Sequence, residues 1–277
     1  MKLNSHAGIL LFMLLDINSV ASAGNKLKSL CEIRYPSDSR IESTCLQLKW
    51  TDTPGALFGE HWQDVLKFNR MDRRHFTGGV SIKVPKRLEE IRNFSPLPQN
   101  YPAAITDAQF ILIDQFEMFL GAYEYGKLVM SFPVAIGSKG HRAPTGIFRI
   151  DAADASHTSK SYLMEEIGRP YPMHYGLRYF VDKKSPLWDS YWIHGRDVPG
   201  YPASHGCIGL YDEQMQYDYY DAYDRKVNKS NYHQLEKPFL DAARRLYLWA
   251  VPTGPDTGTS HRIYNGPRVQ IIGEPPL

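Results

Sequence analysis

The apolar and polar positions of residues 46–85 predict a small domain of two strands and two helices. Residues 46–51 alternate like a half-buried strand, and residues 80–84 alternate in the same way. Between them, Asp52-Thr53-Pro54 is a typical helix start. A short second helix is expected before Gly78-Gly79. The apolar positions that recur at helical spacing in the first helix are Leu57, Phe58, Trp62, Val65, Leu66 and Phe68.

The pattern changes after residue 92. Residues 93–102 are rich in proline and polar side chains, which is typical of a linker or an extended strap. Short apolar runs punctuated by Gly and Pro then favour a β-sandwich or barrel over a βαβ fold. The strands are expected near residues 110–120, 128–136, 147–150, 176–181, 190–194 and 268–272, with helices after Asp212 and after Pro238.

These changes divide the chain into four parts. Residues 1–23 combine Lys2, a short apolar run and an Ala21-Ser22-Ala23 ending, as a secretory signal peptide does. That run is shorter than the ~20 residues that span a bilayer, and no later segment is apolar enough to be transmembrane. The remaining parts are the βααβ domain at 24–92, the linker at 93–105 and a mainly β domain with a C-terminal helical insertion at 106–277. The mature chain is expected to be exported.

Charge and cysteine content narrow the function. A formal net charge of +2 argues against nucleic acid as a partner. In an oxidising compartment Cys31 and Cys45, which lie close together in sequence, are expected to pair, and closing that loop is worth about 3 kcal/mol in the chain-entropy model. The third cysteine, Cys207, is then unpaired, and an unpaired thiol in a secreted protein is a candidate nucleophile.

Reactive side chains are concentrated between residues 192 and 210. Cys207 lies in a turn with His205 and Gly206, and His194 lies upstream on a predicted strand that can return beside the thiol. A thiol needs a nearby base to react at neutral pH, so the pattern predicts a Cys/His nucleophilic site. A zinc site formed by His194, His205 and Cys207 is the alternative. Structural zinc sites usually have four ligands, so we expect neither a metal nor a cofactor.

The sequence Ile193-His194-Gly195 followed by Ser204-His205-Gly206-Cys207-Ile208 resembles the signature of the L,D-transpeptidase catalytic domain. The resemblance extends to the Pro144–Phe148 turn and to Tyr171–Tyr175, and covers about residues 106–273. It implies a periplasmic or cell-wall enzyme with a mostly β catalytic domain.

The resemblance also implies a role for each residue of the motif. Cys207 would be the nucleophile, and His194 would take its proton. The Gly195 carbonyl would orient the imidazole, and the Gly206 and Cys207 amides would stabilise the oxyanion. Ser204 and His205 would shape the turn around them.

The implied substrates are peptidoglycan stem peptides. Members of the family attack the diaminopimelate carbonyl of a tetrapeptide stem, release D-Ala and pass the acyl group to another stem, giving a 3–3 crosslink. Others transfer it to an outer-membrane lipoprotein, or to water as L,D-carboxypeptidases. These alternatives stay open, as does a non-catalytic peptidoglycan-binding protein.

One position departs from the family pattern. The family usually has Arg after Cys-Ile, where this chain has Gly209. Arg196, directly after His194-Gly195, is a candidate substitute in substrate binding. His174 and Tyr175, before the last strand of the motif region, are further candidates for the substrate groove.

The small domain resembles a LysM module. The resemblance depends on Trp62, the Asn69-Arg70 turn and the ending at residues 79–85. LysM modules bind the N-acetylglucosamine backbone of peptidoglycan or chitin, so peptidoglycan glycan is a second expected partner. The usual Gly-Asp-Thr opening is replaced here by Thr51-Asp52-Thr53-Pro54. Sugar binding and a purely structural role are both left open.

Overall fold

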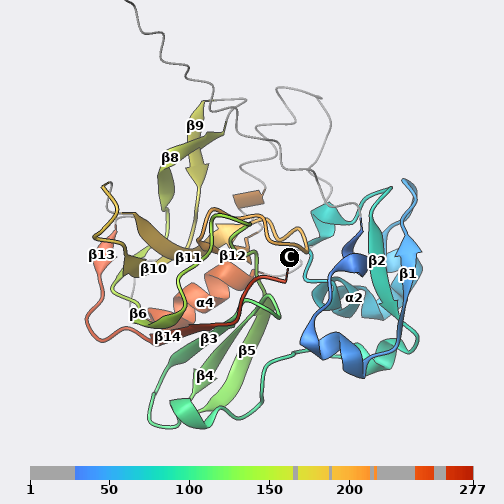
Figure 1. The fold of residues 1–277 in the computed structure, drawn as a ribbon, viewed down its shortest axis with the longest axis horizontal. Coiled ribbons are helices and arrows are strands. Elements are labelled where there is room, and N and C mark those ends of the chain that lie inside the picture. The colour runs from blue at the N-terminus through green and yellow to red at the C-terminus, as the bar shows by residue number, and fades with distance from the viewer. Residues whose placement is uncertain are drawn as a thin grey trace, which may run out of the picture.

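The computed structural model describes residues 29–164, 168–186, 189–212, 215–216, 241–252 and 260–276. The chain forms a small N-terminal module and a larger domain of two sheets, as Figure 1 shows. The expected signal peptide, Pro238 and most of the helix after Asp212 lie outside the described residues. The expected mainly β class is confirmed.

The first sheet of the larger domain has the order β5-β4-β3-β14-β6. The hairpin turn between β4 and β5 is made by Tyr125 and Gly126, both with positive φ, which matches the twist of the strands it joins. β14 lies between β3 and β6 and pairs in parallel with β3, so the last strand in the sequence completes the core of this sheet. The strands are β3 (Phe110–Asp114), β4 (Phe119–Glu124), β5 (Lys127–Pro133), β6 (Gly146–Arg149) and β14 (Arg268–Ile272).

The second sheet has the order β12-β11-β10-β7-β13. Its strands are β7 (Ala152–Asp154), β10 (Gly176–Val181), β11 (Ser190–Arg196), β12 (Ile208–Tyr211) and β13 (His261–Arg262). A separate hairpin of β8 (Thr158–Met164) and β9 (Arg169–Pro172) projects beyond it (Figure 1).

Aromatic side chains and one helix join the two sheets. Phe148 of β6 contacts the rings of Tyr179 and Phe180 of β10, with centroids 5.5 and 5.3 Å apart. Helix α4 (Ala242–Ala250) packs on β11 and β12 with its buried face. Its last turn reaches the first sheet, where the Trp249 indole N–H donates to Glu124 at 2.8 Å. The helix therefore lies between the sheets, as it is drawn in Figure 1.

β11 and β12 pair in parallel, which has a direct consequence for the site. Two parallel neighbours cannot be joined by a tight hairpin, so the chain must cross from the end of one strand to the start of the other. Residues 197–207 make that crossing, and Cys207 is its last residue. His194 and Cys207 are thus brought together by strand pairing.

The N-terminal module has two strands with helices between them in sequence, as expected, but the helices differ from the expected pair. β1 (Ser43–Gln47) and β2 (Ser81–Pro85) are antiparallel, and α1 (Pro54–Phe58) and α2 (Trp62–Phe68) lie between them in sequence. The single helix expected from residue 54 to 68 is interrupted at Gly59, whose φ is +55°. The expected second helix is a short 3₁₀ turn. The 3₁₀ segments are Leu30–Glu32, Pro36–Arg40, Gly59–His61, Arg73–His75, Leu88–Ile91 and Pro102–Ala104.

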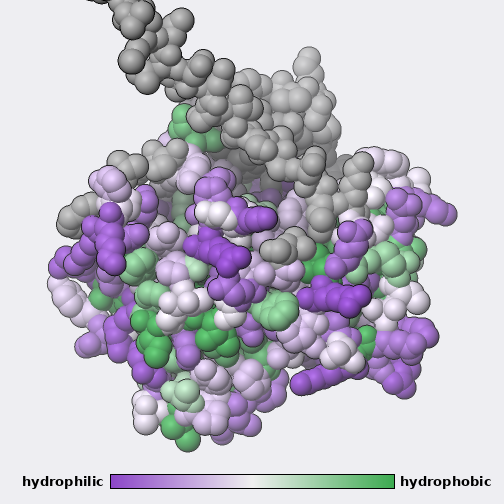
Figure 2. Space-filling view, viewed as in Figure 1, coloured by the Kyte–Doolittle hydropathy of each residue, from purple (hydrophilic) through white to green (hydrophobic). Residues whose placement is uncertain are grey.

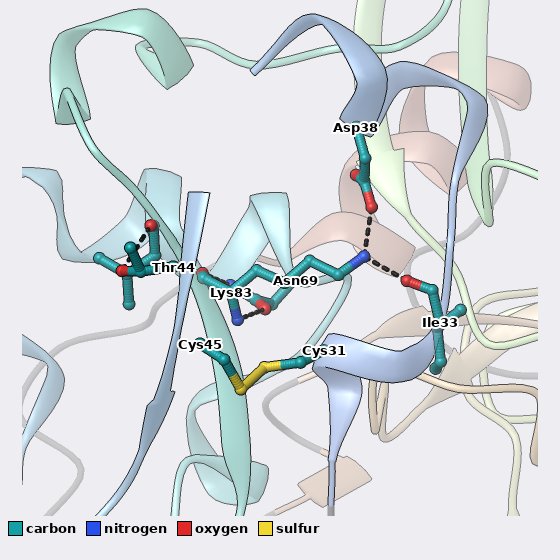
Figure 3. Close-up of a disulfide and its surroundings, with 8 residues drawn as sticks. Cys31, Ile33, Asp38, Thr44, Cys45, Asn69 and Lys83 are labelled. Atoms are coloured by element: carbon teal, nitrogen blue, oxygen red, sulfur yellow. Dashed lines mark hydrogen bonds and ion pairs between the residues drawn. A yellow bond between two sulfur atoms is a disulfide. The ribbon is translucent and has the colours of Figure 1, made fainter. Parts of the chain in front are cut away.

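A disulfide and a buried polar cluster hold this module together. Cys31 and Cys45 are bonded, as Figure 3 shows. Asn69 links the end of α2 to β2, because its side chain exchanges hydrogen bonds of 2.7 and 2.8 Å with the Lys83 backbone. The Lys83 ammonium contacts the Asp38 carboxylate and the Ile33 carbonyl (Figure 3). The Asn69-Arg70 turn is therefore a structural centre of the module.

Buried Arg70 ties the module to the larger domain. Its Nη2 lies 2.8 Å from Oε2 of Glu117, and its Nε donates to the Glu117 carbonyl at 3.1 Å. Glu117 lies in the turn between β3 and β4 and also accepts two bonds from Ser37. The Tyr35 ring stacks on the guanidinium at 3.7 Å. Both charges are buried and paired, so the contact joins the two parts of the chain.

The segment expected as a linker is packed against both parts. Phe94 is buried between Phe68 of α2 and Phe119 of β4, with ring centroids 5.2 and 5.8 Å away. Leu97 is buried as well. Of the two expected forms, linker or strap, the structure shows a strap.

No helix among the described residues is long and apolar enough to cross a bilayer. Figure 2 shows apolar surface in separate small patches on this face, with hydrophilic side chains between them. Scattered patches of this kind are ordinary for a protein surface.

Candidate functional site

His194 and Cys207 share one face of the β11–β12 pair. The register places His194 opposite Gly209, and side chains two residues apart point to the same face of a strand. Cys207, two residues before Gly209, therefore projects on the side of His194. Both line a cavity of about 1030 Å³, and Cys207 is partly exposed in it.

The turn that carries Cys207 is held by Ser204. The Ser204 hydroxyl donates to the Cys207 carbonyl at 2.5 Å and accepts the Gly206 N–H at 3.0 Å. Ser138 donates its amide to the Ser204 carbonyl at 2.8 Å. Gly206 has a φ of +111°, and a Cβ there would lie 2.8 Å from the Tyr191 ring. Only glycine meets both demands of this position.

The bond to Ser204 revises one expectation for the oxyanion. The family resemblance implies that role for the amides of Gly206 and Cys207, yet the Gly206 N–H is already donated to Ser204. We therefore assign Gly206 to the shape of the turn. The amide of Cys207 stays the predicted oxyanion donor.

Gly195 fixes the tautomer of the buried His194. The imidazole Nδ1 lies 2.8 Å from the Gly195 carbonyl oxygen, which can only accept, so Nδ1 carries the proton. The basic lone pair is then on Nε2. Gly195 itself donates its N–H to the His174 carbonyl at 2.7 Å. A Cβ on Gly195 would lie 2.2 Å from Oδ2 of Asp212, so this position excludes a side chain.

Burial keeps both reactive groups neutral. Desolvation lowers the pKa of His194 to about 3, against a weaker opposing effect of its hydrogen bond to Gly195. Desolvation also raises the pKa of the Cys207 thiol, although the Trp192 backbone and Arg196 act to lower it. The resting pair is therefore thiol and imidazole.

The neutral pair predicts a particular pH dependence of Cys207 alkylation. Because only the thiolate reacts, the rate of alkylation by iodoacetamide should be low at pH 6 and should rise ~10-fold for each pH unit up to 8. Mass spectrometry of the alkylated chain measures it. Cys31 and Cys45 are paired and take no label, and Cys207→Ser is the blank. A rate that is constant from pH 6 to 8 would contradict the neutral pair and indicate a thiolate–imidazolium pair.

Arg196 explains the glycine at position 209. A Cβ at Gly209 would lie 2.0 Å from Cδ and 2.1 Å from Cγ of Arg196, so the arginine stem lies directly over Gly209. The guanidinium bonds Asp197, with Nε 3.1 Å from its carbonyl and Nη2 3.3 Å from Oδ1. Arg196 lines the cavity with Cys207. The stem of Arg196 therefore reaches from β11 across Gly209 of β12.

The structure places His174 and Tyr175 beside β11 but outside the lining of the cavity. Nδ1 of His174 lies 3.5 Å from the buried Asp212 carboxylate, and the Tyr175 ring contacts Tyr247 of α4 at 5.7 Å. Neither is among the described residues that line the cavity with Cys207. Their contacts support the backbone that orients His194.

Several residues that line the cavity were not among the predicted site residues. His157 stacks on Trp192 with centroids 4.1 Å apart, and His205 contacts the rings of His141 and Tyr162 at 4.6 and 4.8 Å. Burial, His141 and Arg196 lower the pKa of His205, so that ring favours its neutral form. The aromatic residues of the predicted strand at 190–194 were the one sequence feature that could have indicated them. Within the described part of the chain, no three His, Cys, Asp or Glu side chains are arranged to hold a metal.

Solved structures of L,D-transpeptidases are similar to the chain at low identity. One from Stackebrandtia nassauensis is 16% identical, with 61% of this chain and 57% of that chain covered and a TM-score of 0.36. One from Mycobacterium tuberculosis is 15% identical over 60% and 62%, with a TM-score of 0.33. One from Xylanimonas cellulosilytica is 18% identical over 76% and 78%, with a TM-score of 0.38. The chain thus spans less than two thirds of the first two structures.

No curated protein matches the chain. The model of the YkuD family, the L,D-transpeptidase catalytic domain, matches residues 108–263, which is more than half of the 277 residues. That span contains both sheets up to β13 and the whole turn around Cys207. The chain belongs to the YkuD family of L,D-transpeptidase catalytic domains.

Proposed function

We propose that the chain is a cysteine acyltransferase that acts on peptidoglycan stem peptides. The observation that carries the proposal is the His194 tautomer. Nδ1 is bound to the Gly195 carbonyl, so Nε2 is left as a base on the face that carries Cys207. A neutral imidazole beside a neutral thiol is suited to general-base activation of that thiol.

The first half-reaction releases an amine. Cys207 Sγ attacks the carbonyl of the third residue of a tetrapeptide stem while His194 takes the thiol proton. The amide of Cys207 stabilises the oxyanion, a role usually worth ~3 kcal/mol. The C–N bond breaks, His194 returns the proton to the departing D-Ala amine, and a thioester forms on Cys207.

The acceptor decides the product of the second half-reaction. An amine of another stem attacks the thioester, loses a proton to His194 and gives a 3–3 crosslink. A lipoprotein lysine in the same place gives an attached protein, and water gives a tripeptide. Each reaction restores the Cys207 thiol. The cavity, with about 1030 Å³ of space, accommodates a peptide acceptor.

Arg196 is the residue that we assign to the substrate carboxylate. Its side chain is mostly buried, crosses Gly209 and carries a fixed positive charge at the cavity wall. Stem peptides carry free carboxylates on the donor side of the scissile bond, and an arginine fork binds such groups well. The signal peptide predicted at residues 1–23 supports a periplasmic location, which we include in the proposal. Glycan binding by the N-terminal module stays a prediction.

Incubation with a disaccharide-tetrapeptide, followed by mass spectrometry, tests the proposal. A crosslinked dimer supports transpeptidation, and a tripeptide alone supports the carboxypeptidase alternative. Neither product from folded protein with a reduced Cys207 would overturn the enzyme assignment and leave a non-catalytic peptidoglycan-binding protein. Disaccharide-tripeptide is the matched control, because it lacks the D-Ala leaving group.

A further inference from the structure

The N-terminal module holds the loop that follows His194. Asp72 donates its amide to the Val198 carbonyl, and the Val198 amide donates to the Asp72 carboxylate, both at 2.7 Å. The Tyr35 hydroxyl donates to the Gly200 carbonyl at 3.1 Å. A Cβ on Gly200 would lie 2.6 Å from the Leu30 side chain, so the two surfaces are in close contact. The start of the β11–β12 crossing is thus fixed by residues of the module.

One histidine of the module lies between two carboxylates. Nδ1 of His75 is 2.8 Å from Oδ1 of Asp72, and its Nε2 is 3.5 Å from Oδ2 of Asp197. Burial lowers the pKa of His75, but Asp72 and Asp197 outweigh it and raise the pKa above the ordinary value. Burial likewise opposes ionisation of Asp197, yet Arg196, His75 and Arg74 lower its pKa to about 2.

Asp197 connects this histidine to the cavity. Its Oδ2 faces His75, and its Oδ1 lies 3.3 Å from Nη2 of Arg196 and 3.4 Å from the Tyr171 hydroxyl. The Arg196 stem then lies over Gly209, two residues past the thiol. A continuous row of charged contacts therefore runs from His75 through Asp197 to Arg196 and ends beside Cys207.

We propose that the N-terminal module is a working part of the active site, in which His75 is a positioning residue that sets Arg196 through Asp197. This inference deepens the proposed function and depends on it only for the role of Arg196 toward substrate. With His75 in place, Asp197 is fixed on two sides and directs the guanidinium across Gly209. Without it, Asp197 loses one of its partners and Arg196 loses its defined position.

A double-mutant cycle on the reactivity of Cys207 tests the link without substrate. Arg196→Ala removes a positive charge near the thiol, raises its pKa and should slow alkylation at pH 8 by about 3–10-fold. His75→Gln should also slow the alkylation of Cys207. The double variant should be no slower than Arg196→Ala alone, because His75 acts through Arg196.

Turnover of disaccharide-tetrapeptide gives the second measurement. Loss of a charged hydrogen bond to substrate should raise KM by about tenfold in Arg196→Ala, and His75→Gln should raise KM with a smaller change in kcat. His61→Gln is the matched control. His61 also lies beside carboxylates of the module, at 3.7 Å from Glu60 and Asp64, and should leave both readouts unchanged.

Either of two results would overturn the link. One is a folded His75→Gln protein whose alkylation rate and KM equal those of the wild type. The other is a double variant in which the reductions in alkylation rate of the two single variants multiply. If His75→Gln does not fold, Asp197→Asn is the substitute, because it interrupts the same row of contacts at its centre. Its effect on the alkylation rate must then be non-additive with that of Arg196→Ala. If the wild type makes no product, the proposed function fails, and the alkylation cycle still decides the link.

Discussion

Cys207→Ala is expected to abolish crosslinked dimer and tripeptide alike, with turnover reduced by at least ~10³-fold. In the proposed reaction both products pass through the same thioester, so no second residue can supply the acyl-enzyme. The other two cysteines are joined in the N-terminal module and offer no thiol. Mass spectrometry of the products after long incubation measures the residual activity.

The control for this prediction is the fold of the variant. Cys207 lines the cavity with its side chain partly exposed, so its replacement by alanine should change the melting temperature little. His194→Ala should reduce turnover as well, but it retains the thiol and should still be alkylated. Residual crosslinking by folded Cys207→Ala above the ~10⁻³ level would mean that Cys207 is not the nucleophile.

Arg70→Met should lower the free energy of unfolding by about 3–5 kcal/mol. The arginine is fully buried, and its removal leaves the Glu117 carboxylate buried without its charge partner. It also removes the hydrogen bonds to Ser37 and to the Glu117 carbonyl. Urea unfolding followed by fluorescence gives the free energy directly.

Two further variants calibrate that result. Arg87→Met removes an exposed ion pair with Glu90 in the same module and should cost less than about 1 kcal/mol. Arg70→Met combined with Glu117→Gln removes the uncompensated charge and should recover part of the loss. An Arg70→Met protein no less stable than Arg87→Met would show that the buried pair contributes nothing.

Local patterns in the sequence were sufficient to nominate His194 and Cys207, which the structure places in the wall of one cavity. His194 lies on a predicted strand, and Cys207 lies in a glycine turn, so both were identified from their immediate neighbours. The Cys31–Cys45 pair followed from the small number of cysteines in a chain that is predicted to be exported. The two-sheet domain followed from short apolar runs separated by Gly and Pro, although the parallel pairing of β11 with β12 carried no local signal.

The residues that the sequence did not explain depend on partners far along the chain. Gly209 is glycine because the stem of Arg196, on the neighbouring strand, occupies the space of a side chain. His75 lies in a 3₁₀ turn with no periodic pattern, and its partner Asp197 is 122 positions later in the printed sequence. The family resemblance implied an oxyanion role for the Gly206 amide, and its bond to Ser204 was not foreseen because that bond depends on the exact closure of the turn.

The parallel pairing of β11 and β12 makes the proposed reaction sensitive to strand register. Side chains alternate between the faces of a strand, so a slip of β12 by one residue would turn Cys207 away from His194 while nearly all backbone pairing survived. A chain misfolded in this way would keep its sheet content and its disulfide and would still make no product. Activity, more than any spectroscopic measure of secondary structure, therefore reports whether β12 has docked correctly.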